Sequence, residues 1–326
     1  MCVCVFGDSH SDTETFPGSV ETADSPKGSW FAMDTVSGRV SVTMETLQQR
    51  AEVDSDISDD FPRSSITPAV LAHQGRLEGL LKEFQANSTR YLGFKVLVFE
   101  PISVADPTHL GKSVRSYEVW HYCNMISPPE PSNPKILSQK TGGIGNAVPP
   151  FYWRKVAYAR EMFAKFIDGR MMEFRAVDEG NFQDYKRSLV DGLFGILTDR
   201  YQNYPDKQLK QQSPNFTDAE CYSYSEMLTR LRERNYGTRL QTIILVDHDD
   251  KVHYIERFFT RAPEDFQYRE SNLWIYLPPM HAEIRAKKLK DEGKEESRVD
   301  EEQPPRTQMF SAEESMSQHQ DARGND

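Results

Sequence analysis

Cysteine is scarce in this sequence, and long apolar runs are absent. The 326 residues include four cysteines, at positions 2, 4, 123 and 221, too few and too scattered for a disulfide framework or a zinc site. This usage is typical of a reducing compartment. No uninterrupted apolar run approaches about 18 residues, which predicts no transmembrane helix, and no secretory leader opens the chain. We therefore expect a cytoplasmic protein.

A basic excess and a glycine-rich nucleotide loop are also missing. Lysine and arginine total 39 against 50 aspartate and glutamate, which gives a net charge of −11. That balance argues against nucleic acid or an anionic membrane as the main partner. The glycines of "KTGGIGNA" at 140–147 have the wrong spacing for a P-loop or a dinucleotide loop. The sequence therefore gives no sign of a required cofactor.

Two polar regions interrupt an otherwise foldable chain. Residues 284–326 contain a single aromatic residue, Phe310, among many charges, so they bury too little apolar surface to offset the entropy of ordering. A shorter polar stretch at 52–62 is typical of a loop. We predict one folded domain over residues 1–283 and a disordered charged tail over 284–326.

Apolar periodicity predicts the elements of that domain. Alternating residues predict strands at 28–34, 38–44, 94–100, 117–123 and 272–277, and a hairpin at 242–259 that turns at "DHDD". Helical spacing predicts a helix at 68–85 and two further helices, with apolar stripes from Val156 to Phe166 and from Phe182 to Ile196. Helices segregated from largely antiparallel sheet favour an α+β class over a doubly wound α/β fold.

Several stretches, in order over residues 1–277, resemble the transport-and-Golgi-organization-2 family, also called the NRDE family. "YGTRLQTIILVDHDDKVHYIERFF" at 236–259 is similar to the family's C-terminal hairpin and is the most specific match. "GSWFAMDTVSGRVSVTM" resembles its Gly-Thr-Trp hairpin, and "YLGFKVLVFE" its Tyr-x-Gly-Phe-Asn strand. "GIGNAVPPFYWRKV" is similar to its Ser-Asn-Ala and Pro-Trp-x-Lys stretch, and "MCVCVF" to its Met-Cys start.

The chain departs from the family at the tetrapeptide Asn-Arg-Asp-Glu, which does not occur in it. In the family this motif lies between the Met-Cys start and the Gly-Thr-Trp hairpin, so the gap falls between about Gly7 and Phe16. There the chain turns polar, and we expect one hairpin arm to be missing. The gap indicates either a skipped segment in this form of the chain or a divergent paralogue.

The resemblance implies an Ntn-hydrolase-like fold, in which two antiparallel sheets are sandwiched between helices as an αββα sandwich. It also implies a role in Golgi organisation and protein secretion, haem mobilisation or lipid homeostasis, in the cytoplasm with an association with Golgi or mitochondria. The expected ligand is small and hydrophobic or amphipathic, either haem or an acyl lipid. Haem would be a transported ligand in this case.

Cys2 is the first candidate for chemistry. Once Met1 is removed, its thiol and its free α-amine form a nucleophile with its own base, because an α-amine has a pKa of roughly 8. The alternative is a small strand residue in "CVCVF", alternating with its neighbours between two faces. The arginine and aspartate that position the nucleophile in related cysteine Ntn hydrolases belong to the missing motif.

Two further positions match the family's pattern. Asn146, in "GIGNA", has a side-chain N–H that can stabilise an oxyanion, or it is a loop residue that tolerates a left-handed conformation. Arg239, in "YGTR", can lower a thiol pKa or clamp a carboxylate or phosphate, or it forms a structural ion pair. With Cys2 they make up the candidate catalytic set.

The histidines and tryptophans give weaker signals. As haem or metal ligands, His121, His248 and His253 lack supporting spacing, so we expect half-exposed strand or turn histidines. Trp30 and Trp153 could stack on a flat ligand, but core packing is the better reading. The leading hypothesis is a non-catalytic binding factor, and the alternative is a cysteine N-terminal-nucleophile amidohydrolase that uses Cys2.

Overall fold

The computed structural model describes most of the chain up to residue 279. The described residues are 2–11, 30–46, 62–106, 113–125, 133–139, 141–149, 152–178, 180–234, 236–259 and 268–279. Contacts divide the chain into Met1–Met280 and His281–Asp326, and every described residue belongs to the first unit. The predicted tail at 284–326, and nearly all of the predicted loop at 52–62, lie outside the described residues.

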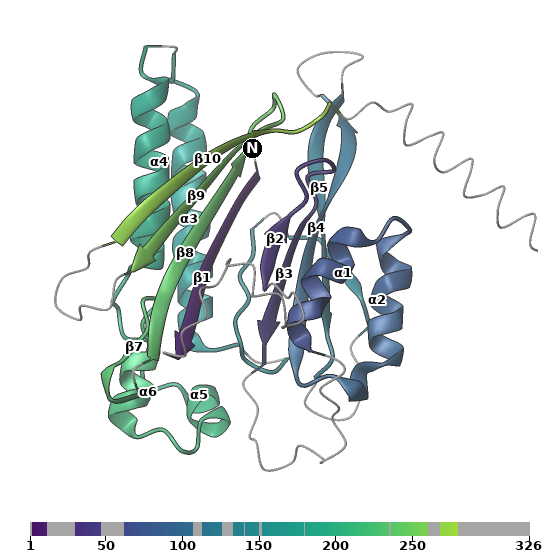
Figure 1. The fold of residues 1–326 in the computed structure, drawn as a ribbon. Coiled ribbons are helices and arrows are strands. Elements are labelled where there is room, and N and C mark those ends of the chain that lie inside the picture. Colours follow the sequence, from purple (N-terminus) through teal and green to yellow (C-terminus); the bar gives the residue numbers. More distant parts are fainter. Residues whose placement is uncertain are drawn as a thin grey trace, which may run out of the picture. The chain divides into compact units, whose positions relative to one another are not determined.

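The folded unit is α+β, with two antiparallel sheets (Figure 1). One sheet has the order β2-β3-β4-β5-β6, with strands Phe31–Met33, Val40–Glu45, Phe94–Ala105, Ser113–Cys123 and Lys135–Leu137. The other has the order β1-β8-β9-β10, with strands Cys2–Ser11, Tyr236–Val246, Lys251–Phe259 and Tyr268–Tyr276, and the short β7, Arg230–Leu231, pairs with β8. All recorded strand pairs are antiparallel. The predicted α+β class is therefore confirmed.

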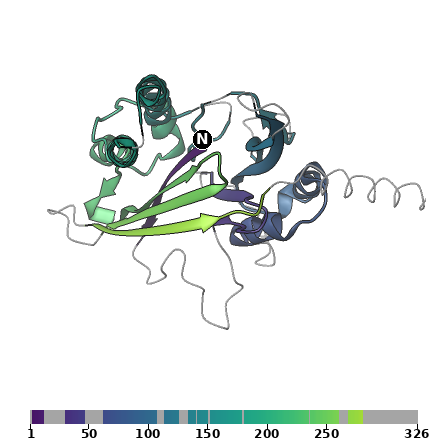
Figure 2. The ribbon, with the colours of Figure 1, turned by 90° about the horizontal axis from the view of Figure 1, so that it is seen from above.

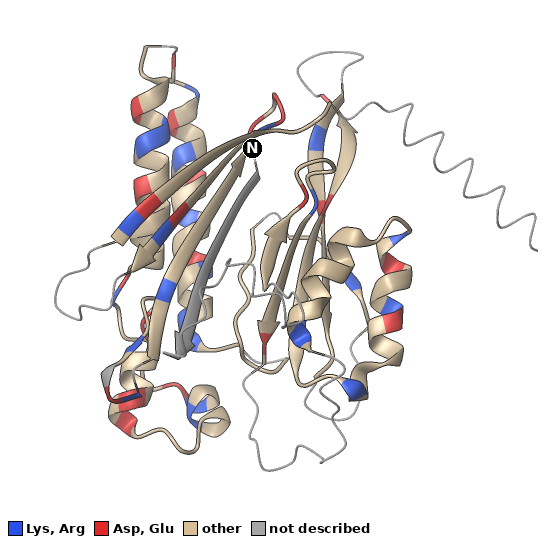
Figure 3. Cartoon of the chain, in the orientation of Figure 1, with Lys and Arg blue, Asp and Glu red and all other residues tan. Residues whose placement is uncertain are grey.

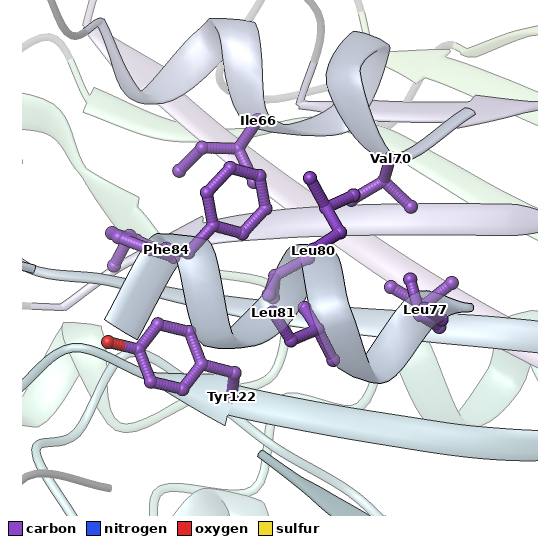
Figure 4. Close-up of a cluster of buried hydrophobic side chains, with 10 residues drawn as sticks. Ile66, Val70, Leu77, Leu80, Leu81, Phe84 and Tyr122 are labelled. Atoms are coloured by element: carbon purple, nitrogen blue, oxygen red, sulfur yellow. The ribbon is translucent and has the colours of Figure 1, made fainter. Parts of the chain in front are cut away.

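Helices α1 and α2 cover the outer face of the β2–β6 sheet (Figure 4). Leu77, Leu80, Leu81 and Phe84 are buried, as their helical spacing predicts, and they pack in one cluster with alternate residues of β4. The single helix expected at 68–85 is wrong, because the segment forms α1, Ile66–Ala72, and α2, Leu77–Ala86.

The break between these two helices is explained by a buried arginine, Arg39, directly before β3. The guanidinium of Arg39 donates to the carbonyl oxygens of Val70, at 3.0 Å, and His73, at 2.7 Å. The same guanidinium is paired with Glu100, with 2.5 Å between Nε and Oε2. Arg39 thus satisfies the carbonyls that end α1, which is the role a following helical turn would otherwise play.

Helices α3 and α4 cover the outer face of the second sheet. They span Arg154–Phe174 and Phe182–Leu197, in agreement with the two apolar stripes in the sequence, and Figure 2 views them nearly end-on. Buried residues of α4, Leu189 and Leu193 among them, pack against Ile243 and Ile255 of the sheet. Within the described residues, no helix combines the length and apolar character needed to span a membrane.

The layer between the sheets is apolar at one end. Val40 of β3, Val246 of β8 and Val252 of β9 are buried in one cluster, together with Ile244 and Leu277. This cluster joins the two sheets, so the order of layers is α1 and α2, one sheet, the other sheet, then α3 and α4. The layer order agrees with the expected αββα arrangement, while the relation to Ntn hydrolases stays a prediction.

A buried arginine closes that apolar end. The Arg115 side chain is 2 % exposed and its Nε lies 2.7 Å from Asp250 Oδ1 in the β8–β9 turn. It also donates to the carbonyl oxygens of Ser37 and Pro278. Asp250 (φ 59°) and Gly38 (φ 83°) both adopt left-handed backbone here. One guanidinium therefore ties β5, the β2–β3 turn and the second sheet together.

A helical subdomain that periodicity missed follows α4. It contains α5, Lys207–Gln212, and α6, Asp218–Tyr224, each too short to show a helical period. Trp153, 1 % exposed, packs here against Tyr224 with ring centroids 5.5 Å apart, which confirms its expected role in core packing. Trp30 is half-buried, and the Arg63 Cζ atom lies over its ring, 5.7 Å from the ring centroid.

Strand β1 is longer than the apolar residues at its start. It runs from Cys2 to Ser11 and pairs with β8 along its whole length, with an irregularity between Asp8 and Ser9. The polar residues from Asp8 to Ser11 thus belong to the strand, since backbone hydrogen bonds carry a strand through polar residues. Residues 12–16, where the rest of the expected gap falls, lie outside the described residues.

Candidate functional site

The backbone register places Cys2 at the apolar end of the inter-sheet layer. The Cα of Cys2 is opposite that of Val246, and the Cα of Cys4 is opposite that of Ile244. Both partners belong to the apolar cluster that joins the sheets. The predicted nucleophile thus begins the strand at the closed end of the sandwich.

Arg239 lies at the other end of the same strand pair. It is a half-buried residue near the start of β8, seven positions before Val246. At a strand rise of about 3.3 Å per residue, the Cα atoms of Arg239 and Val246 are roughly 23 Å apart. A cation lowers a thiol pKa from within about 6 Å, so this register does not bring Cys2 and Arg239 together.

Asn146 is held in a fixed loop between β6 and α3. The carbonyl oxygens on either side of it, those of Gly145 and Ala147, both accept hydrogen bonds from Lys95 Nζ, the first at 2.7 Å. A Cβ at Gly145 would lie 2.7 Å from Val156 Cγ2, so a larger residue does not fit there. Ala147 is buried. Asn146 is therefore well positioned, although the proposed oxyanion role stays a prediction.

Lys95 is a buried cation that the sequence analysis did not single out. It is 1 % exposed on β4, and alternation along the strand puts it on the same face as Phe99, which packs in the inter-sheet cluster. Burial lowers the pKa of Lys95 to about 8. The signal was present in "FKVLVFE", where one lysine interrupts a strand otherwise suited to burial.

His121 lies on the same inner face, diagonally across from Lys95. It is in register with Leu97 of β4, two positions from Lys95. His121 is 8 % exposed, and neither ring nitrogen has a hydrogen-bond partner. The expectation of a half-exposed histidine is therefore wrong, and His121, which the sequence analysis considered as a ligand and set aside, is a second functional candidate.

Burial and two lysines keep the His121 ring neutral. Loss of hydration lowers the pKa of His121 to about 4, and the charges of Lys95 and Lys135 act in the same direction. A neutral imidazole has one nitrogen that can accept a hydrogen bond or bind a metal, and one N–H. Each unpaired buried nitrogen lowers the folding stability by about 1–3 kcal/mol. Since His121 does not stabilise the fold in this way, we treat its position as a candidate functional site.

Cys123 completes the inner-face cluster that we call the polar cluster: Lys95, His121, Cys123 and the loop Gly145–Ala147. Cys123 is opposite Lys95 in register, and its Sγ donates to the carbonyl of Met125 at 2.9 Å. Burial raises the pKa of the Cys123 thiol. A buried thiol with a raised pKa is unreactive, so Cys123 is not a nucleophile here.

The remaining histidines differ from His121. His248 is exposed in the β8–β9 turn. His253 is 9 % exposed, so the expectation of half exposure is wrong for it too, and its Nε2 lies 2.9 Å from Asn272 Oδ1. Among the described residues no three His, Cys, Asp or Glu side chains converge as a metal-binding group would. A protein-held metal ion therefore has no visible site in the described part of the chain.

Lys155 shows what a fully satisfied buried lysine looks like. Its Nζ donates to the carbonyl oxygens of Tyr224 and Glu226 and to Thr229 Oγ1, at 2.7, 3.3 and 3.1 Å, and lies 4.3 Å from the Tyr224 ring centroid. Burial lowers its pKa to about 7. All three ammonium protons are used, so Lys155 fastens α3 to the last residue of α6 and the segment after it, and has no spare donor.

Comparison with known proteins identifies the relatives of this chain. A sequence profile described as Transport and Golgi organisation 2 matches residues 8–261. "Transport and Golgi organization protein 2" of Drosophila melanogaster is 24 % identical over 217 residues, which cover 67 % of this chain and 64 % of that protein. "Transport and Golgi organization 2 homolog" of Mus musculus is 24 % identical over 230 residues, 71 % of each chain.

Proposed function

The chain belongs to the Transport and Golgi organisation 2 family, and on that premise we propose that it is a non-catalytic factor in Golgi organisation and protein secretion. In this proposal it works from the cytoplasm, in association with Golgi or mitochondria, and carries a small amphipathic ligand. The family match of this chain and the names of its relatives support the role in Golgi organisation and protein secretion. The polar cluster supports the binding of a small amphipathic ligand.

The ligand that the polar cluster fits best is haem. The single observation that carries this assignment is His121, a buried neutral imidazole with both nitrogens unpaired. Haem iron needs only one or two axial protein ligands, so one histidine suffices where no group of three metal ligands converges among the described residues. Haem also brings an apolar macrocycle, which suits the layer between two sheets.

An acyl lipid finds a weaker match in the same cluster. Its anionic head is held best by a cation with several free donors, whereas two of the three N–H groups of Lys95 Nζ already donate to the carbonyls of Gly145 and Ala147, which leaves one. His121 in its neutral form offers one N–H and no positive charge. We therefore place haem first and keep acyl-CoA as the second arm of the experiment.

The experiment is a titration of the full-length chain with hemin, followed by the Soret band, in wild type, His121→Leu and His253→Leu. His253 is the matched control, because it is also a buried strand histidine with one unpartnered nitrogen. We expect a saturable Soret shift in the wild type. His121→Leu should weaken the hemin affinity at least tenfold, and His253→Leu should leave it within about twofold of the wild-type value. Binding that His121→Leu leaves unchanged would contradict the assignment of His121.

A parallel calorimetric titration with acyl-CoA distinguishes the two ligands. Under the haem proposal, acyl-CoA binds weakly or not at all, and His121→Leu does not change its affinity. Saturable acyl-CoA binding without any Soret shift would replace haem by an acyl lipid as the ligand. Absence of both kinds of binding would contradict the carrier function itself.

The alternative hydrolase function is weaker on geometric grounds. Cys2 pairs with Val246 at the apolar end, and Arg239 lies seven positions away along β8. Intact mass spectrometry tests the remaining requirement, a free α-amine on Cys2. Retained Met1 or an acetylated terminus would exclude the hydrolase, while a free Cys2 together with amide-bond hydrolysis that Cys2→Ser abolishes would overturn the non-catalytic proposal.

A further inference from the structure

The outer edge of the second sheet is formed by an exposed strand. β10, Tyr268–Tyr276, pairs with β9 over all nine of its residues and is the last strand in the order β1-β8-β9-β10. Every residue of β10 except Ile275 is exposed. Among the described residues no strand pairs with its other edge, which therefore presents backbone N–H and C=O groups that a further strand can use.

Aromatic side chains line one face of this edge in a fixed arrangement. The Trp274 ring stacks on the His253 ring, with centroids 3.9 Å apart and an interplanar angle of 3°. Trp274 and Tyr276 are nevertheless 42 % and 70 % exposed. His253 is itself held by Asn272, at 2.9 Å. The indole is thus immobilised before any partner arrives, which lowers the entropic cost of binding.

Two lysines converge on the same indole. Lys186 Nζ, from α4, lies 3.4 Å from the Trp274 ring centroid, and Lys251 Nζ lies 4.7 Å from it and 5.3 Å from that of Tyr276. Neither lysine forms an ion pair among the described residues. Burial and the charge of Lys251 lower the pKa of Lys186 to about 8, against a weaker opposite effect of Asp247.

The other end of β10 is different, because its cation is neutralised. The Arg257 guanidinium lies between two carboxylates, 2.8 Å from Glu270 and 3.4 Å from Asp191, and it also covers the Tyr268 ring at 4.4 Å. Figure 3 shows charges of both signs on α3 and α4. Arg269 of β10 is exposed as well, but alternation puts it on the opposite face from Trp274. On the face that carries Trp274, uncompensated positive charge therefore lies at the Trp274 end of the strand, on Lys186 and Lys251.

We propose that β10 is a docking edge for an extended acidic segment of a partner protein, which adds a strand beside it. Main-chain hydrogen bonds to an edge strand supply affinity, and alternate side chains supply specificity. Acidic side chains on one face of the added strand meet Lys186 and Lys251. Apolar side chains on the other face cover Leu273, which is 53 % exposed. The partner segment thus alternates acidic with apolar residues.

The experiment uses the full-length chain and three synthetic nine-residue peptides. The first alternates valine with glutamate, the second replaces each glutamate by lysine, and the third keeps the glutamates but replaces two central valines by proline, which blocks strand pairing. Binding is measured by calorimetry, and protection of the β10 amides by hydrogen exchange. We expect the first peptide to bind at least tenfold more tightly than either other peptide and to slow exchange in β10.

Charge reversal and a matched control complete the test. Lys186→Glu combined with Lys251→Glu should weaken the affinity for the first peptide at least tenfold. The control is Lys165→Glu, because Lys165 is an exposed lysine paired with Glu161 on α3. This change should leave the affinity within about twofold of wild type. Equal binding of the first and third peptides would show simple charge attraction and overturn strand addition. Absence of saturable binding by the first peptide would overturn the proposal. The outcome is independent of haem binding at His121.

Discussion

The two ends of the layer between the sheets are built on opposite principles. At one end Arg115 makes three contacts across both sheets and closes an apolar cluster. Toward the other end, Lys95 lies eight positions along β4 from Ser103, the register partner of Arg115, and beside it His121 has two unpaired nitrogens. Since all three guanidinium nitrogens of Arg115 donate hydrogen bonds at the first end, while both ring nitrogens of His121 are unpaired at the second, we assign stability to the first end and the candidate site to the second.

The largest expected effect is the loss of the Arg115 clamp. Arg115→Met removes one partner of a buried ion pair and leaves Asp250, whose side chain is 18 % exposed, with an uncompensated charge. Removal of one such partner typically costs about 3–5 kcal/mol of unfolding free energy. Urea unfolding measures this, and Arg115→Lys serves as a second variant that keeps the charge but loses the guanidinium group with its several donors. A loss below about 1 kcal/mol for Arg115→Met would show that the two ends do not differ.

The His121 ring should make stability depend on pH. Its pKa is about 4 when folded, against a reference value of 6.5, so the unfolded chain binds the proton first on acidification. Stability is therefore full above about pH 6.5 and falls as the pH drops toward 4, by about 3 kcal/mol in total. Urea unfolding across this range should show a flatter pH dependence for His121→Phe. Identical slopes for the two proteins would contradict the buried, neutral ring.

The Lys95 contacts should have a smaller and more local effect. Lys95→Met leaves the carbonyls of Gly145 and Ala147 without their donor, which we expect to cost about 1–3 kcal/mol and to speed hydrogen exchange at residues 144–148. Lys82→Met is the control, because Lys82 is 63 % exposed in a pair with Glu78 and such pairs contribute under about 1 kcal/mol. Unchanged exchange in the loop would show that Lys95 does not position Asn146.

The smallest expected effect is that of Cys2 on ligand binding. Because Cys2 is in register with Val246 at the apolar end, Cys2→Ser should leave the hemin affinity within about twofold of wild type. The hemin titration in the Soret region measures this directly. A tenfold loss would place Cys2 at the ligand and remove the distinction between the two ends.

Much of the fold was predictable from periodicity. The stripes of α3 and α4 and the alternation along β8 and β9 each show their period over many residues, and the hairpin turn "DHDD" lies between the two strands. The break between α1 and α2 was not predictable, because it depends on Arg39, which is distant in sequence. Short helices such as α5 and α6 carry too few residues to show a period.

The candidate site was less predictable than the fold. Asn146 was found through its match to the family's Ser-Asn-Ala pattern, but the lysine that holds its loop, Lys95, comes from a strand 50 residues before Gly145. His121 reads in sequence like any strand histidine, and only the pairing of β4 with β5 puts it beside a buried lysine. Whether a buried side chain lacks a hydrogen-bond partner depends on tertiary packing, so no local sequence pattern predicts it.

The most direct test of the account is NMR of the His121 ring in full-length protein labelled with ¹⁵N-histidine, recorded with and without hemin. The account predicts a neutral His121 ring that resists protonation to about pH 4 and whose signal alone is lost or strongly shifted when hemin binds, while the His253 signal persists. A His121 ring that titrates near pH 6.5 and keeps its signal with hemin bound would contradict the central claim.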